Sequence, residues 1–142
     1  MAEVTVSERV PVERGKAWAL MSDLSRLDEW LALHEGWRSE VPRELTTGTE
    51  LVSVVSFKGV RNRVTWVVEE LRPPELIVLT GDGKGGTKAS LRFAAAAVGA
   101  ETEIELHAEF SNPALVGPLG GVMARRLKGE LRKSIARLVE LV

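Results

Sequence analysis

Three side chains in this sequence are candidates for acid–base chemistry inside an apolar pocket: His34, Arg38 and Glu70. General acid–base catalysis needs such a group within reach of a bound substrate. His34 follows Trp30 and precedes Trp37, in a short loop that we expect to lie near a sheet. Two alternatives stay open for it: the ring points into a cavity, or it caps the preceding helix.

The residue types that are missing exclude several chemistries. The chain has no cysteine and no tyrosine, which rules out disulfides, thiolate metal sites, a cysteine nucleophile and a tyrosine hydroxyl as catalyst. A metal site needs three or four convergent ligands. The two histidines are far apart, and glutamates such as Glu69, Glu103 and Glu105 fall mostly on outward strand positions. We therefore expect no metal and no other cofactor. No Gly-x-Ser-x-Gly elbow is present either.

Two further features fit ordinary structural roles. The glycine-rich stretch 81–88 superficially resembles a phosphate loop, but Lys84 is followed by Gly85 and a strand pattern comes next. A P-loop requires Ser or Thr after the lysine and a helix beginning there, so we expect a hairpin turn. His107 alternates with Leu106 and Ala108, which places it on the outward face of a strand.

Length and composition describe one globular domain over residues 1–142. The chain is 44% hydrophobic and 27% charged, with a formal net charge of −1. That balance gives no general attraction to nucleic acid or to an anionic membrane, and a basic stripe on the last helix is expected to be solvated. The first residues resemble no secretory signal, and no apolar run reaches the roughly 20 residues of a membrane span. Together with the absence of cysteine, this favours a cytoplasmic location.

Hydrophobic periodicity predicts the order of the elements. Alternation over Glu3–Val10 predicts a strand, and helical spacing predicts two short helices, from Val12 to Met21 and from Leu24 to Leu31. Five strands follow, with turn residues between them and with a further short strand near Trp37–Val41. The five are Leu51–Phe57, Arg63–Leu71, Leu76–Thr80, Thr87–Val98 and Glu103–Phe110.

The last segment predicts one long amphipathic helix after Asn112-Pro113. Its apolar residues recur at steps of three and four, and its outer face is basic. The fold class is therefore α+β, a curved antiparallel sheet that buries one face against a helix. The apolar stripe comprises Leu115, Leu119, Val122, Met123, Leu127, Leu131, Ile135, Leu138 and Val142.

The inward-facing residues either form a plain core or line a cavity at one end of this helix. Binding pockets are concave and mostly apolar, with a few polar groups. His34, Arg38 and Asn62 are the available polar groups, and glycines near the helix start favour an opening there. The candidate ligand-binding residues are Trp30, His34, Trp37, Phe57, Asn62, Trp66, Phe93, Phe110, Leu119 and Met123.

Several motifs, in order, resemble the START/SRPBCC superfamily, whose fold is a helix-grip: a curved sheet wrapped around a long C-terminal helix. The resemblance covers essentially the whole chain. Val10–Trp18 and Leu24–Trp30 are similar to the usual first strand-to-helix junction and second helix. Other segments resemble an actinobacterial branch of the polyketide cyclase/dehydrase family, which includes a mycobacterial toxin of a type II toxin–antitoxin pair. These are Trp37–Glu40, Lys58–Trp66, Gly81–Gly86 and Asn112–Gly120.

The resemblance implies a pocket between the long helix and the sheet, and a small hydrophobic ligand. Aromatase/cyclases of this family use a pocket arginine near the end of one strand and a nearby tyrosine. Here that strand ends Glu69-Glu70-Leu71 and no tyrosine exists, so Arg38, Arg61 or Arg63 would have to substitute.

Three hypotheses follow. The first is a protein that binds a small hydrophobic, aromatic or polyketide-like molecule. The second is a cyclase or dehydratase acting on such a substrate through His34, Arg38 or Glu70. The third is a toxin whose partner is a small antitoxin protein. The edge strands of the sheet could also pair in a homodimer or stay free.

Overall fold

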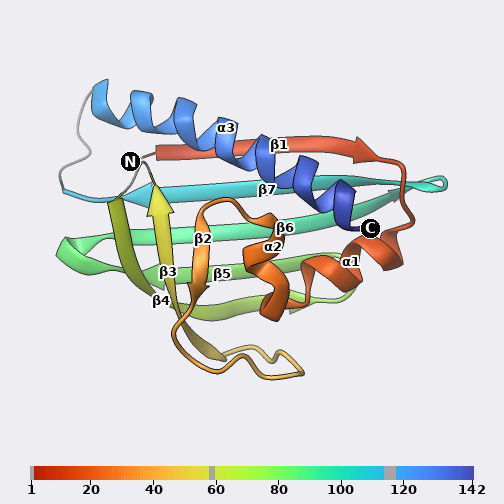
Figure 1. The fold of residues 1–142 in the computed structure, drawn as a ribbon, viewed down its shortest axis with the longest axis horizontal. Helices are drawn as coiled ribbons and strands as arrows, with labels where there is room; N and C mark the ends of the chain where they lie inside the picture. The colour runs from red at the N-terminus through yellow and green to blue at the C-terminus, as the bar shows by residue number, and fades with distance from the viewer. Residues whose placement is uncertain (1, 58–59, 114–117) are drawn as a thin grey trace.

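The computed structural model describes residues 2–57, 60–113 and 118–142, and for residues 57, 60, 118 and 119 the backbone alone. A curved seven-stranded antiparallel sheet has the order β1-β7-β6-β5-β4-β3-β2, and three helices lie on its concave side (Figure 1). The strands are β1 (Ala2–Val10), β2 (His34–Trp37), β3 (Glu50–Phe57), β4 (Val60–Arg72), β5 (Leu76–Asp82), β6 (Lys88–Val98) and β7 (Glu101–Ser111). The helices are α1 (Arg14–Met21), α2 (Leu27–Trp30) and α3 (Pro118–Leu141), with short 3₁₀ turns at Leu24–Arg26 and Lys84–Gly86.

Alternation along the strands sets the inner face of the sheet. In β7, Ile104, Leu106 and Ala108 have no exposed surface, whereas the intervening side chains face outward. His107 therefore lies on the outer face, as its position in the sequence predicted. The α+β helix-grip architecture is confirmed.

The long helix α3 lies along β1 and beside α2 (Figure 1). Leu127, Leu131 and Ile135 are fully buried, while Val122 and Val142 are each 40% exposed. The predicted apolar stripe is therefore wrong at those two positions, because Val122 turns away from the sheet and Val142 follows the last helical residue. Leu115 and the side chain of Leu119 lie outside the part of the chain that is described.

The segment between α1 and β3 differs most from the expected pattern. The second predicted helix is divided into the 3₁₀ turn Leu24–Arg26 and the four-residue α2. The next strand begins at His34, three residues earlier than predicted. His34 is therefore the first residue of a strand, and its main chain pairs with Val55 of β3.

One buried hydroxyl joins α3 to this short segment. The Oγ of Ser134 accepts a hydrogen bond from the Ala32 N–H at 2.9 Å and donates one to the Glu130 carbonyl at 2.8 Å. Ser134 has no exposed surface, so water cannot replace either bond without rearrangement. The hydroxyl thus fixes the link between α2 and β2 against the helix.

We expect Ser134→Ala to lower the free energy of unfolding by about 1–3 kcal/mol, because the Ala32 N–H loses its partner. Urea unfolding followed by circular dichroism measures this. Ser111→Ala, at an exposed strand end, is the control and should change stability by less than about 0.5 kcal/mol. Equal effects of the two substitutions would contradict the role given to Ser134.

Candidate functional site

A small internal cavity lies where α2 and β2 cover the inner face of the sheet. Its volume is about 10 Å³, room for no more than one water molecule. Strands β2 to β7 each contribute at least one side chain to its wall, and the other lining residues come from α2 and the link that follows it. The lining residues are Leu27, Leu31, Leu33, His34, Trp37, Ser53, Val55, Trp66, Leu79, Leu91 and Phe110.

A hydrogen bond and a glycine together hold the indole of Trp66 in the cavity wall. Its Nε1 donates to the Oγ of Ser53 at 2.8 Å, and both side chains are buried. Gly81 lies opposite Trp66 on the neighbouring strand. A Cβ at Gly81 would lie 2.7 Å from both Trp66 Cε3 and Val64 Cγ1, which is too close for carbon atoms. The absence of a side chain at Gly81 therefore gives the indole its place.

Trp37 forms the part of the wall next to the edge of the sheet. Its Nε1 donates to the Leu24 carbonyl at 2.6 Å, which uses the only polar atom of the ring. Its ring centroid lies 4.5 Å from that of His34, with the planes inclined at 53°. Trp37 therefore presents an aromatic surface and no free polar group.

His34 is the titratable residue in the cavity lining. It is 6% exposed, and its Nε2 atom is buried without a hydrogen-bond partner among the residues that the structure describes. Burial lowers the pKa of His34 from 6.5 to about 4, and the smaller opposing effect of the Asp28 charge does not reverse the shift. The imidazole is thus neutral near pH 7, and Nε2 is available to a hydrogen-bonding ligand.

The structure brings together four of the ligand-binding residues expected from the sequence: His34, Trp37, Trp66 and Phe110. Trp30 and Phe93 are buried next to them as an edge-to-face pair 5.3 Å apart, in the adjoining core. Met123 packs half-buried against the same core from α3. The side chains of Phe57 and Leu119 lie outside the described part of the chain.

The remaining polar candidates lie elsewhere. Arg38 and Asn62 line a separate hollow beside β3 and β4. Glu70 is half-buried on β4, and its carboxylate pairs with Arg72 at 2.6 Å. Of the three acid–base candidates, only His34 reaches the cavity.

Ser53 is a cavity residue that the analysis of the sequence missed. It lies in β3 in phase with Leu51 and Val55, so period-two alternation alone places it on the inner face. The sequence signal that could have found Ser53 is a serine at an inward position among valines and leucines, because a buried hydroxyl must have a hydrogen-bond partner.

On the outer face of the sheet, Glu3, His107 and Glu109 place their ligand atoms within 4.8 Å of one another. The Nε2 of His107 lies 3.0 Å from a Glu109 oxygen, and its Nδ1 lies 2.6 Å from the Thr5 hydroxyl. These donor types could hold a divalent cation. The group is separated from His34 by the sheet and contributes nothing to the cavity.

Over its whole length, residues 1–142, the chain matches the model of the family described as polyketide cyclase/dehydrase and lipid transport. The chain belongs to this family. A protein of unknown function from Mycobacterium tuberculosis, Rv1546, is 43% identical over 141 residues, which span 99% of each chain. Toxin Rv0910 from the same organism is 38% identical over 141 residues, 98% of this chain and 96% of the toxin.

Solved structures show the same fold at low sequence identity. A START superfamily protein from Mycobacterium smegmatis has a TM-score of 0.77 at 19% identity and covers all of both chains. The Zhui aromatase/cyclase from a Streptomyces species has a TM-score of 0.78 at 14% identity, over 97% of this chain and 91% of its own. Family and fold thus agree with the resemblance seen in the sequence. Within the described residues, no helix is both long and apolar enough to cross a membrane.

The lowered pKa of His34 makes stability depend on pH in a defined direction. The unfolded chain takes up a proton near pH 6.5, whereas the folded chain does so only near pH 4. The free energy of unfolding should therefore fall as the pH is lowered from 6.5 to 4. Urea unfolding across this range should show a shallower decline for His34→Leu than for the parent. Identical slopes in the parent and in His34→Leu would contradict the assignment.

Proposed function

We propose that this protein binds a small, mainly apolar or aromatic molecule in the cavity beneath α2 and β2, with a polar group of the ligand bonded to His34. The observation that carries the proposal is the buried, unpartnered Nε2 of His34 in a mainly apolar wall, where the Ser53 hydroxyl is already bonded to Trp66. Buried polar atoms without partners are few in folded proteins, and each calls for an explanation. A ligand that donates a hydrogen bond to this nitrogen, or accepts one from it, would supply the missing partner. The family description, which names polyketides and lipids, supports the same ligand class.

The lining suits an aromatic ligand. Trp37, Trp66 and Phe110 offer ring surfaces, and the indole nitrogens of Trp37 and Trp66 are already bonded within the protein. An aromatic guest can therefore stack or pack edge-on without leaving either nitrogen unpaired. His34 and the Ser53 hydroxyl are the polar side chains that would orient it.

Binding requires the cavity to open, because pockets for small molecules are about 300–1,000 Å³ and this one holds about 10 Å³. The cover is the part of the fold most suited to move. It consists of a four-residue helix and a four-residue edge strand. Its hydrogen bonds to the rest of the fold include the Ala32–Ser134 bond and those between β2 and β3. Elements with few such bonds open at lower free energy than the body of a sheet.

Cyclase or dehydratase catalysis at this cavity would have to use His34. Arg38 is exposed outside it, and Glu70 is paired on β4. A neutral imidazole could take a proton from a bound substrate, but no second titratable side chain lines the cavity among the described residues. Ligand binding without turnover is therefore the function that the geometry supports best.

Two matched probes test this proposal, naphthalene and 2-naphthol, which differ by one hydroxyl. Each is titrated into the protein against the fluorescent reporter N-phenyl-1-naphthylamine. We expect both to displace the reporter, and 2-naphthol to bind about two- to tenfold more tightly because its hydroxyl donates to His34 Nε2. His34→Leu should bind both probes with equal affinity, while His107→Gln should keep the preference.

A second variant tests the location of the binding site. Gly81→Ala pushes the Trp66 indole into the cavity and should weaken both probes together, with folding checked by circular dichroism. The proposal fails if the parent protein binds neither probe nor reporter, or if the preference for 2-naphthol survives in His34→Leu.

The toxin relative favours a second candidate function, growth inhibition in a cytoplasm where a small antitoxin protein neutralises the chain. Its support is the 38% identity over nearly all of both chains. Induced expression of this chain alone in a mycobacterial host should then slow growth within a few generations. Colony counts against the empty vector measure this, and unchanged growth at confirmed expression would count against the candidate.

A further inference from the structure

A second hollow, here called the basic hollow, lies outside the cavity. It has a volume of about 490 Å³. Arg61 and Arg63 alternate along β4 with inward residues, so they point away from the cavity. Arg38 follows β2, and Lys84 lies in the 3₁₀ turn between β5 and β6. Its lining is Arg38, Val54, Arg61, Asn62, Arg63 and Lys84.

The positive charge of the basic hollow is largely uncompensated. No carboxylate is part of its lining. Arg61 forms a two-point pair with Glu35, in which its Nε lies 2.9 Å from the carboxylate. Arg38, Arg63 and Lys84 form no ion pair within the residues described, and Asp82, the last residue of β5, is paired with Lys88. Three free positive charges thus converge in a chain whose formal net charge is −1.

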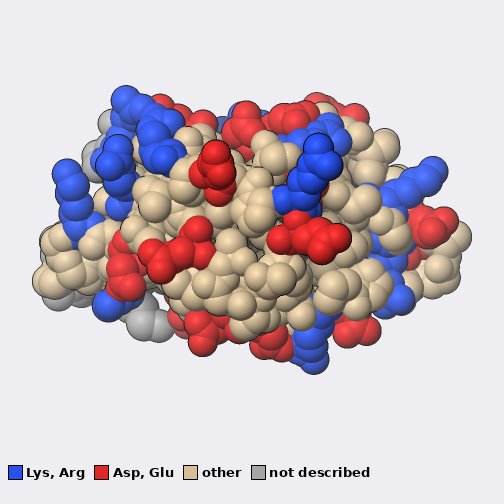
Figure 2. All heavy atoms as spheres, turned by 90° about the horizontal axis from the view of Figure 1, so that it is seen from below, with Lys and Arg blue, Asp and Glu red and all other residues tan. Residues whose placement is uncertain are grey.

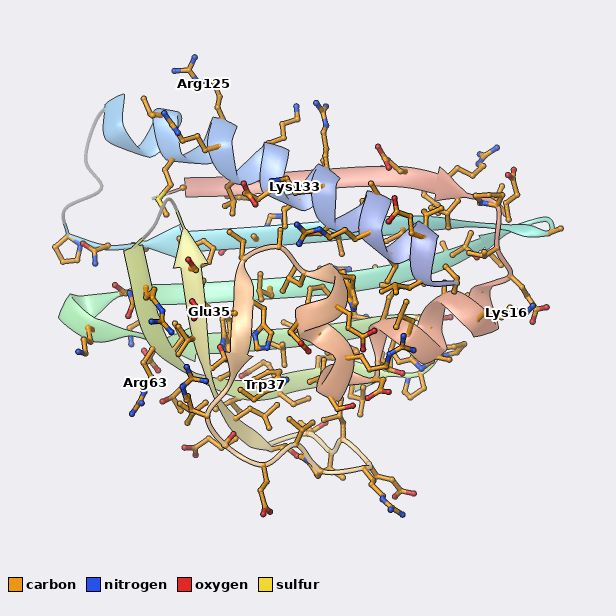
Figure 3. All side chains as sticks on the ribbon, in the orientation of Figure 1. Lys16, Glu35, Trp37, Arg63, Arg125 and Lys133 are labelled. Atoms are coloured by element: carbon orange, nitrogen blue, oxygen red, sulfur yellow. The ribbon has the colours of Figure 1, made fainter. Side chains whose placement is uncertain are left out.

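The basic hollow differs from the other basic surface of the molecule. On α3, Arg125, Lys128 and Arg132 are exposed along a convex helix, and Lys133 pairs with Glu130 at 3.6 Å. Figure 3 shows Arg63 and Arg125 projecting from opposite sides of the fold. Figure 2 views the molecule from below and shows Lys and Arg side chains spread over this face among Asp and Glu side chains. The concave shape is what allows several cations to reach one bound group.

We propose that the basic hollow binds a small molecule bearing a di- or oligophosphate group. Guanidinium groups match phosphate oxygens with two parallel hydrogen bonds, and the lysine adds a compact charge. Three uncompensated cations suit a multivalent anion, since a single carboxylate would leave most of the charge unpaired. The volume falls in the range of small-molecule sites and leaves room for an organic group beyond the phosphates.

A compact ligand fits better than a long polyanion. The carboxylate of Glu35 flanks the site as the partner of Arg61, and the overall charge supplies no extended positive field along which a nucleic acid could lie. The basic hollow and the cavity share no lining residue, so this proposal does not rest on the function proposed above.

Isothermal titration with pyrophosphate at low ionic strength tests the proposal. The double variant R63Q/K84Q removes two charges from the basic hollow, and R125Q/K128Q removes two from α3. We expect at least tenfold weaker pyrophosphate binding in R63Q/K84Q and less than a twofold change in R125Q/K128Q. Affinity in the parent should fall as salt is added. Both double variants should bind 2-naphthol like the parent, which separates this test from that of the cavity.

Three outcomes would overturn the proposal. The parent protein fails to bind pyrophosphate, or R63Q/K84Q binds it as the parent does, or both double variants weaken equally, which indicates net charge alone. A hexaglutamate peptide is titrated in parallel. If it binds in a way that R63Q/K84Q abolishes while pyrophosphate does not bind, the basic hollow serves an acidic protein segment instead.

Discussion

The curved sheet of this fold has more inward surface than one helix can cover, and this constraint shapes the site. Helix α3 packs against β1, β7 and α2, and buries one row of leucines and isoleucine. The inner faces of β3, β4 and β5 lie beyond that row. The short segment from Leu24 to Trp37 covers them, and Ser134 fixes it to α3 through the Ala32 N–H. The cavity lies beneath this segment.

The same region places a buried polar atom without a partner, His34 Nε2, beside an aromatic wall. Trp66 and Trp37 each give their indole N–H to an acceptor within the protein, so the wall costs little in lost hydrogen bonds. His34 has no such partner for Nε2, and its burial keeps it neutral near pH 7. The site has one polar group to satisfy and an apolar surface to fill, and the proposed small aromatic ligand would meet both requirements.

The elements of this fold could be predicted from the sequence because its strands carry a strict alternation. In β7 every second residue from Thr102 to Phe110 is buried, and β1 follows the same alternation except at the exposed Glu8. The segment from Leu24 to Trp37 has no such period, because it is too short to repeat. Its division into a 3₁₀ turn, one helical turn and an edge strand depends on contacts with α3 and β3, which lie far away in the sequence. The sequence therefore left two alternatives for the position of His34, and the burial of the Ser53 hydroxyl was not predicted.

Alternation also explains why Arg38 does not meet His34, although the sequence made both candidates for one pocket. Asn62 is in phase with Trp66 and pairs with the cavity residue Val55, so it shares the inner face, but it lines the basic hollow and not the cavity. His34 and Trp37 face inward, and the next residue along the chain turns away from the cavity. On the neighbouring strands, Val55 lines the cavity while Val54 lines the basic hollow. Two adjacent residues of one strand thus face the apolar interior and the charged surface. In this arrangement the proposed apolar ligand would lie on the inner face and the proposed anion among the outward arginines, so no charge would enter the core.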